Sequence, residues 1–250
     1  STDTLGSRST AIGWSALYTA TTPSDNVAIG ADALYANTTG ASNVAIGKGS
    51  LDANTTASNN TAVGTNSLVA NTTGTENVAV GVSSGLANTT GNYNTAFGSN
   101  ALATNTTAVS NTAIGRYALN ANTDGTQNTA VGYNNMIANT TGSYNTAIGG
   151  LTLDANTTGG SNTALGYSAL GANISAGALT AVGANALDAN TTGGNNTAVG
   201  YDALTSNTTS GENTAVGRSA LSANLTAAYN TAVGANAGLS VTTGAVNVFV

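Results

Sequence analysis

The chain of 250 residues contains no cysteine and no histidine. Their absence excludes disulfides, thiol chemistry, cysteine- or histidine-ligated zinc sites and histidine-based catalysis. Charged residues make up only 6% of the chain, aromatic residues only 5%, and Pro23 is the single proline. The apolar fraction of 40% nevertheless argues against a disordered chain, because disordered chains combine high net charge with few apolar groups.

The small number of basic residues and the lack of a long apolar run disfavour nucleic-acid-binding and membrane-spanning proteins. The net charge is −6 and there are only four lysines and arginines, so phosphate contacts and nucleic-acid binding are not expected. No stretch approaches the roughly 18–20 apolar residues of a membrane-spanning helix. The first residue is Ser1 and the only methionine is Met136, which indicates a removed leader or a part of a longer chain.

What the sequence does contain is a strict repeat of 17 residues. The marker N-T-A-V-G and its variants begin at Ser9 and recur at every seventeenth residue, ending in a truncated copy at Asn247. This predicts a single solenoid over the whole chain. It consists of a partial coil at 1–8, fourteen complete coils at 9–246 and a partial coil at 247–250. We number the positions of each unit from 1 to 17, starting at the marker.

The consensus unit, N-T-A-V-G-x-x-A-L-x-A-N-T-T-G-x-x, predicts the fold class. Position 3 is Ala and position 5 is Gly in all fourteen complete units, and position 9 is Leu in eleven. Such strictness indicates that every unit occupies the same environment, as in stacked coils. The segment T/V-A-V/I fits a strand closed by Gly, A-L-x-A fits a second strand, and Asn-Thr-Thr-Gly fits a turn. We therefore predict an all-β parallel β-solenoid (β-roll) with two short strands per 17-residue coil.

Alternation along the first strand predicts which side chains share a face. We expect positions 2 and 4 to face the interior together with Leu at position 9. The invariant Ala at position 3 is then expected on the opposite face, where it would pack laterally against another chain or another layer, for example at Ala62, Ala113 and Ala198. We expect the Asn side chains at positions 1 and 12 to stack in ladders. Charged residues gather at positions 6, 7, 10 and 17, which we expect to face solvent.

No set of residues predicts catalysis, a metal site or a cofactor. The ten acidic residues are scattered over the coils, as solvated turn charges would be. Calcium-binding β-rolls need repeated turn aspartates, and here the repeated turn residue is Asn. The sequon Asn-Thr-Thr recurs at position 12, as at Asn37, Asn139 and Asn207. Coils about 4.8 Å apart leave no room for a glycan on each, which favours a role for Asn in turns and ladders.

All nine tyrosines occupy positions 6, 7, 10 or 17. Exposed aromatic rings suit contacts with glycans or proteins, and sealing of the coil corners explains them equally well. An ice-binding threonine row is a third interpretation, disfavoured because positions 13 and 14 lie in a turn and position 2 is expected inside. The candidate adhesive residues are Tyr133, Tyr144, Tyr167 and Tyr201.

The chain ends on an apolar run without the polar cap that usually closes a solenoid. Together the two ends supply twelve of the seventeen positions of one coil. This predicts head-to-tail stacking of copies into a filament. The alternative is that the chain is part of a longer one and that its ends are interrupted repeats. The predicted assembly interface consists of Leu5, Val241, Val246, Val248, Phe249 and Val250.

The unit N-T-A-V/I-G-x-x-A-L-x-A resembles the head repeat of trimeric autotransporter adhesins, the YadA-like family, whose pattern is S-V-A-I-G-x-x-A-x-A-x-G. The segment NVAIGADALYA, Asn26–Ala36, carries the closest match. The repeats are also similar to those of phage-type tail fibres and bacterial surface proteins. The resemblance implies a left-handed β-roll, often a homotrimer, on an extracellular fibre at a cell surface or on a virion. The 17-residue unit is longer than the usual coil of that family, with the extra length in the Asn-Thr-Thr turn.

We therefore expect a non-enzymatic structural protein that builds a rigid extracellular fibre or filament. Its expected partner is itself, as a homotrimer or as a head-to-tail filament. The alternative is an adhesive or receptor-binding fibre shaft that contacts cell-surface glycans through exposed tyrosines, and an ice-binding solenoid is third. No cofactor, nucleic acid or membrane span is expected.

Overall fold

A computed structural model describes residues 8–22 and 24–250. It is an all-β parallel β-solenoid of about fourteen turns with about 17 residues per coil. The described residues include no helix, and therefore none long and apolar enough to cross a membrane. The coils fall into two compact units, Ser1–Thr126 and Gln127–Val250, which we call unit 1 and unit 2 and describe separately.

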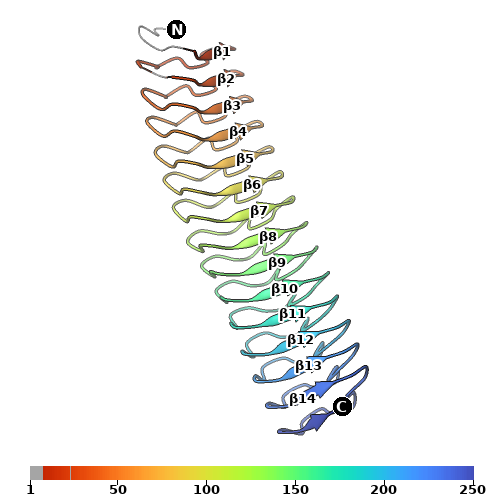
Figure 1. Cartoon of the computed structure of the whole chain (residues 1–250). Helices are drawn as coiled ribbons and strands as arrows, with labels where there is room; N and C mark the ends of the chain where they lie inside the picture. The colour runs from red at the N-terminus through yellow and green to blue at the C-terminus, as the bar shows by residue number, and fades with distance from the viewer. Residues whose placement is uncertain (1–7, 23) are drawn as a thin grey trace. The chain divides into compact units, whose positions relative to one another are not determined.

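Each coil of unit 1 contributes one short strand at positions 2–4 of the repeat (Figure 1). Successive strands pair in parallel and in register, so that Thr61 lies opposite Val78 and Ala62 opposite Ala79. Like positions therefore stack on like positions along the unit. The strands are β1 (Thr10–Ile12), β2 (Val27–Ile29), β3 (Val44–Ile46), β4 (Thr61–Val63), β5 (Val78–Val80), β6 (Thr95–Phe97) and β7 (Thr112–Ile114).

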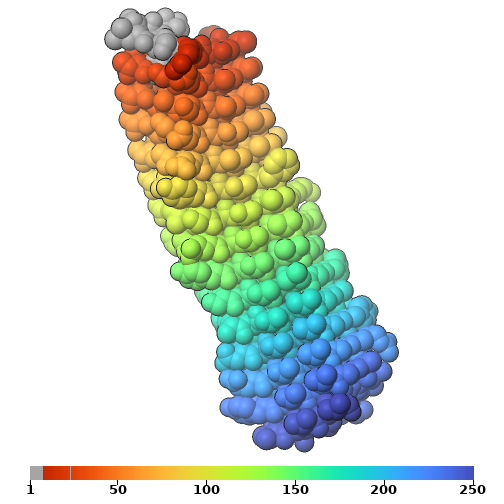
Figure 2. Space-filling model, in the orientation of Figure 1, coloured from red at the N-terminus to blue at the C-terminus, as the bar shows by residue number. Residues whose placement is uncertain are grey.

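Unit 2 repeats this arrangement with the same register. Thr180 lies opposite Thr197, and Ala181 opposite Ala198. On the face shown in Figure 2, successive coils of each unit form closely stacked layers. The strands of unit 2 are β8 (Thr129–Val131), β9 (Thr146–Ile148), β10 (Thr163–Leu165), β11 (Thr180–Val182), β12 (Thr197–Val199), β13 (Thr214–Val216), β14 (Thr231–Val233) and β15 (Val248–Phe249).

The prediction of a second strand at A-L-x-A is wrong, because positions 6–11 form a run of turns. Positions 7 and 9 adopt left-handed backbone angles, as at Asp202 (φ 55°) and Leu204 (φ 51°). Residues with side chains rarely adopt these angles, which cost roughly 1–2 kcal/mol each. The N–H of Leu204 donates to the carbonyl oxygen of Ala220 in the next coil, at 3.0 Å. This bond and the complete burial of the Leu204 side chain offset the strain.

The predicted orientation of the first strand is also wrong, because position 3 faces the interior. Ala62, Ala113 and Ala198 are completely buried within their own chain, so the lateral packing surface expected there does not exist. A Cβ added at Gly85, position 9, would lie 3.7 Å from the Cβ of Ala79, position 3 of the same coil. The two positions therefore face each other across a narrow core. With Leu on one side, only Ala fits on the other, which explains why Ala is invariant.

The predicted asparagine ladders are confirmed, and they form the polar side of the core in unit 1. At position 12, Nδ2 of Asn54 donates to Oδ1 of Asn37 in the preceding coil, at 2.9 Å. At position 1, the backbone N–H of Asn43 donates to Oδ1 of Asn26, at 2.8 Å. Within one coil, Nδ2 of Asn43 and Nδ2 of Asn54 both donate to the carbonyl oxygen of Ala57. The ladders thus satisfy buried polar groups of the turn as well as one another.

The same ladders run through unit 2. Nδ2 of Asn173 donates to Oδ1 of Asn156 at 2.8 Å, and Nδ2 of Asn207 donates to Oδ1 of Asn190 at 2.8 Å. The position-12 asparagines are buried and bonded in this way, which supports the ladder interpretation over glycosylation of the repeated sequon. Leu179 interrupts the position-1 ladder, but its backbone N–H still donates to Oδ1 of Asn162.

Glycine at position 5 is required by backbone angle and by close approach together. Gly183 has a φ of 132°, and a Cβ there would lie 2.5 Å from the carbonyl oxygen of Gly200 in the next coil. Side chains are excluded by both conditions. This glycine ends each strand and lets adjacent coils approach to strand-pairing distance.

Candidate assembly and binding surfaces

Because position 3 faces inward, positions 2 and 4 of every strand project outward and form what we call the sheet face. Position 4 is apolar throughout, and its side chains are half-exposed or exposed, with Phe97 54% and Ile148 42% exposed. Position 2 is Thr or Val. The sheet face is therefore a continuous apolar and hydroxyl-bearing strip in each unit, and large strips of this kind mark interaction sites.

The two units differ at position 2 of the sheet face. In unit 2, all seven strands β8–β14 carry Thr at this position. In unit 1, three of the seven strands β1–β7 carry Val, at Val27, Val44 and Val78. Unit 2 thus presents an uninterrupted row of threonines beside a row of aliphatic side chains.

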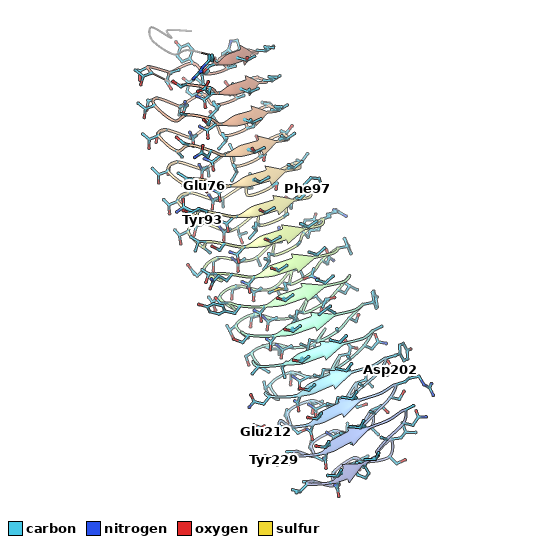
Figure 3. The ribbon with its side chains drawn as sticks, viewed as in Figure 1. Glu76, Tyr93, Phe97, Asp202, Glu212 and Tyr229 are labelled. Atoms are coloured by element: carbon cyan, nitrogen blue, oxygen red, sulfur yellow. The ribbon has the colours of Figure 1, made fainter. Side chains whose placement is uncertain are left out.

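The coil edges carry the remaining outward side chains (Figure 3). In unit 2, Glu212 and Tyr229, both at position 17, project from one edge, whereas Asp202 at position 7 lies at the opposite edge. The expected exposure is confirmed at position 17, which is exposed in all described coils, and at position 6, which is half-exposed or exposed. Positions 7 and 10 are mostly half-buried, because the turns draw them toward the coil.

The four candidate adhesive tyrosines do not share one surface. Tyr133, Tyr167 and Tyr201 occupy position 6 at the Asp202 edge and are 52%, 59% and 54% exposed. Tyr144 is 63% exposed but occupies position 17, at the other edge with Tyr229. Three of the four therefore form a row, and the fourth is separate from them.

Other aromatic residues make contacts within the fold. The rings of Tyr18 and Tyr35, at position 10 of neighbouring coils, stack in parallel with centroids 5.5 Å apart. The guanidinium of Arg116 lies 4.5 Å from the ring centroid of Tyr117. These rings fit the interpretation that some aromatics seal the coil corners.

Carboxylates gather along position 10 in unit 2. A Cβ added at Gly171 would lie 2.5 Å from Oδ1 of Asp188 and 3.6 Å from Oδ1 of Asp154, so the two carboxylates flank this glycine. Partial burial, and then the charge of Asp202, raise the pKa of Asp188. Partial burial raises the pKa of Asp154 as well, and the charge of Asp188 adds to it.

Unit 1 has one carboxylate of the same kind. Partial burial, and then the charge of Asp32, raise the pKa of Asp52. In the described part of the chain, no three or more acidic side chains converge as metal ligands would.

The C-terminal coils expose three of the six residues of the predicted assembly interface. Val246 and Val248 are 77% and 76% exposed, and Val250 is fully exposed. Phe249 is half-buried and occupies the inward position 3, where its ring approaches Gly238. Val241 is half-buried, and Leu5 lies outside the described residues. Head-to-tail stacking through these residues stays a prediction.

The sheet face is the surface that sequence reasoning placed on the wrong side of the strand. The signal that reveals it is the difference in tolerance between positions. Position 2 exchanges Thr for Val and position 4 exchanges Val, Ile, Leu and Phe, whereas position 3 admits only Ala in every complete unit. A position that accepts a ring as large as Phe97 has open space in front of it, and a position fixed as Ala does not.

Comparison with known proteins leaves the chain without a family assignment. It matches no protein-family profile and no curated protein sequence.

Proposed function

We propose that this chain is a non-enzymatic structural protein whose copies associate side by side through the sheet face to build a rigid extracellular fibre. The observation that carries the proposal is the row of outward apolar side chains at position 4. Ile148 is 42% exposed, and the same position is apolar in every coil. Burying such a strip against a partner would contribute about 25 cal/mol for each Å² of apolar surface removed from water.

The periodicity of the sheet face favours a second copy as the partner. Within each unit the strands pair in strict register, so identical side chains recur at one strand spacing, about 4.8 Å. A surface with this repeat is matched best by another surface with the same repeat. A self-complementary strip on a solenoid therefore fits a homo-oligomer. A homo-oligomer with rotational symmetry would contain a fixed number of chains.

The repeat pattern supports the same proposal. The strand T/V-A-V/I-G resembles the head repeats of YadA-like trimeric autotransporter adhesins and of phage-type tail fibres, which implies a left-handed homotrimer on a cell surface or a virion. We propose an equivalent trimeric fibre for this chain. The inward Ala and outward position 4 leave the sheet face, rather than an alanine face, as the surface available for trimer contacts.

Sedimentation of the full chain tests the proposal. We expect the unmodified protein to sediment as an oligomer, and the variant Ile148→Lys/Val182→Lys to sediment as a folded monomer, because two charges would be buried without partners. The matched control is Thr158→Lys/Thr192→Lys, which places the same charges on exposed turns of the same two coils. The control is expected to remain oligomeric.

Two results would contradict lateral assembly. One is an unmodified protein that stays monomeric at all concentrations, and the other is an oligomer that persists in Ile148→Lys/Val182→Lys. Circular dichroism of each variant establishes that the coils remain folded.

Ice binding is a second candidate function, favoured by the outward threonine row of unit 2. Position 2 is half-exposed and faces outward, which removes one of the two objections to this interpretation. Flat, regular rows of Thr on a rigid sheet suit an ordered water lattice. Thermal hysteresis by the monomeric protein, lost on Thr180→Lys, would favour ice as the occupant of the sheet face. A protein that oligomerises and shows no hysteresis would favour the fibre.

A further inference from the structure

Position 6 of unit 2 carries a regular alternation of aromatic and small residues. The order along five successive coils is Tyr133, Gly150, Tyr167, Ala184 and Tyr201. All three tyrosines are more than half exposed. No such alternation exists at position 6 of unit 1, where the tyrosines are absent. We call these three side chains the tyrosine row.

The backbone holds the tyrosine row at fixed intervals. The carbonyl oxygen of Tyr167 accepts the N–H of Asn185 in the next coil at 3.0 Å, and that of Tyr201 accepts the N–H of Ser219 at 2.8 Å. Because the tyrosines recur at every second coil, successive rings are about 9–10 Å apart, twice the strand spacing. A rigid row of this kind needs little ordering when a ligand binds.

The small residues between the tyrosines give the rings room to lie along the row. A Cβ added at Gly150 would meet Cδ2 of Tyr167 at 3.8 Å, so the Tyr167 ring leans over the preceding coil. The residue before Tyr201 in the row, Ala184, is small as well. A larger side chain at either position would compete with the ring for this space.

Polar groups flank the row at the same edge. Asp202 follows Tyr201 directly in the chain, and its Oδ1 accepts a hydrogen bond from Nδ2 of Asn185 at 3.0 Å. A carboxylate has about four acceptor sites, so Asp202 retains acceptors for other donors. Asp188 lies close enough for the charge of Asp202 to act on it. The edge thus combines aromatic faces with hydrogen-bond acceptors.

We propose that the tyrosine row binds an extended, uncharged β-1,4-linked polysaccharide along the axis of unit 2. In such a chain every second sugar repeats the same orientation, and the length of two sugar residues is close to the spacing of two coils. The apolar C–H face of a pyranose ring stacks on an aromatic face, and its hydroxyl groups donate to carboxylates such as that of Asp202.

The charges near the row argue against anionic polymers, including nucleic acids and charged polysaccharides. Asp188 and Asp202 repel phosphate, sulfate and uronate groups, and Arg218 at the following position 6 is the only cation among the described residues of unit 2. Nucleic acids stack on aromatic platforms too, but they need a basic groove along the backbone. The row uses different side chains from the sheet face, so the proposal does not depend on lateral assembly.

Calorimetric titration of the full chain with cellohexaose, chitohexaose and maltohexaose tests the proposal. We expect one or both β-1,4-linked hexasaccharides to bind, and the α-linked maltohexaose not to bind, because its helical chain does not match the straight row. Binding of cellohexaose alone identifies a glucan, and binding of chitohexaose alone identifies an N-acetylglucosamine polymer. Failure of both to bind overturns the proposal, whatever the assembly state of the protein.

Variants separate the tyrosine row from tyrosines in general. Tyr167→Ala is expected to weaken binding about tenfold, the size of effect that loss of one stacking platform produces. Tyr167→Phe keeps the ring and is expected to bind within about twofold of the unmodified protein. Tyr144→Ala removes a similarly exposed ring on the other edge; it is the matched control and is expected to leave affinity unchanged. Equal losses in Tyr144→Ala and Tyr167→Ala would overturn the proposal.

Discussion

Unit 1 and unit 2 have the same residues at most interior positions and differ on their outer surfaces. Both have Ala at position 3, Gly at position 5 and a ladder of Asn at position 12. On the outside, position 6 of unit 1 is heterogeneous and includes Trp14, Lys48 and Arg116, whereas unit 2 alternates Tyr with small residues up to Tyr201. The inner positions are set by the narrow core and the close approach of coils. The outer positions are free of these constraints and carry what distinguishes the two units.

The two units fill the core differently where position 9 lacks its usual Leu. Position 9 is Gly rather than Leu at Gly85 in unit 1 and at Gly238 in unit 2. Beside Gly85 the missing side chain leaves a cavity lined by Leu68 and Leu102 among others. Beside Gly238 the ring of Phe249 occupies the space, with Cδ2 2.9 Å from where a Cβ would lie. Unit 1 therefore keeps a cavity beside its glycine, whereas unit 2 fills the equivalent space with the side chain at position 3 of the following coil.

The largest effect is expected from a substitution that breaks the common interior. Gly81→Ala in unit 1 and Gly183→Ala in unit 2 each place a Cβ at 2.5–2.7 Å from the backbone of the next coil, at φ of 132°. Both should lower the free energy of unfolding by more than about 3 kcal/mol, since neither the angle nor the contact can be relieved without separating the coils. Chemical denaturation followed by circular dichroism measures the loss.

Gly150→Ala is the control for this comparison. Its added Cβ would meet its nearest neighbours only at 3.8–4.0 Å, so a change within about 0.5 kcal/mol is expected. If Gly81→Ala and Gly183→Ala were as mild as Gly150→Ala, position 5 would not be the point of close approach between coils.

The sequence predicted the fold to the extent that periodicity determines it. A repeat of 17 without insertions predicts parallel stacking in register, and Asn at positions 1 and 12 predicts the ladders, as at Asn54. Leu at position 9 was placed inside correctly, as Leu204 shows. The charges placed position 17 correctly on the outside, as Glu212 shows.

The orientation of the strand was not predicted because alternation is symmetric. It states that positions 2 and 4 share a face opposite to position 3, and leaves open which of the two faces lies inside. Core width decides this, and core width depends on the turns after Gly at position 5. Those turns place Leu204 and its equivalents at left-handed angles, which the residue type does not suggest. Because the orientation of the strand was reversed, the sheet face was not predicted and the lateral contact was assigned to Ala198 instead.

The second-largest effect on stability is expected from a substitution that fills the cavity in unit 1, which has no counterpart at the filled site in unit 2. Gly85→Leu restores the consensus residue, and position 9 already accepts Leu at φ near 50°, as at Leu102. The side chain would fill the cavity and displace only the flexible end of Leu68, whose Cδ2 lies 2.9 Å from the added Cβ. We expect a gain of about 1–2 kcal/mol in the free energy of unfolding.

Gly238→Leu is the matched variant in unit 2 and should act in the opposite direction. The ring of Phe249 already fills this space, so the new side chain has to expel it, at a cost of roughly 1–3 kcal/mol. The double variant Gly238→Leu/Phe249→Ala should recover most of the loss, because it restores the usual Leu at position 9 and the usual Ala at position 3 of the following coil. Equal effects of Leu at Gly85 and Gly238 would contradict the difference between the two sites.

The smallest effect concerns the carboxylates that unit 2 concentrates along positions 7 and 10. Burial and the charge of Asp202 raise the pKa of Asp188 above its ordinary value of 3.8. The folded state therefore binds this proton more tightly than the unfolded state, and the resulting stability is present at acidic pH and lost as pH rises through the folded pKa. Asp188→Asn should raise the Tm at neutral pH by about 1–2 °C and leave it nearly unchanged at acidic pH.

Asp202→Asn and the double variant identify the cause of this pH dependence. If mutual repulsion contributes, either single substitution relieves it, and the double variant gains less than the sum of the two at neutral pH. If the gains are additive, burial alone raises the pKa of Asp188. Scanning calorimetry over pH distinguishes the two results. A Tm of Asp188→Asn that falls below that of the unmodified protein at neutral pH would show that the carboxylate stabilises unit 2 instead.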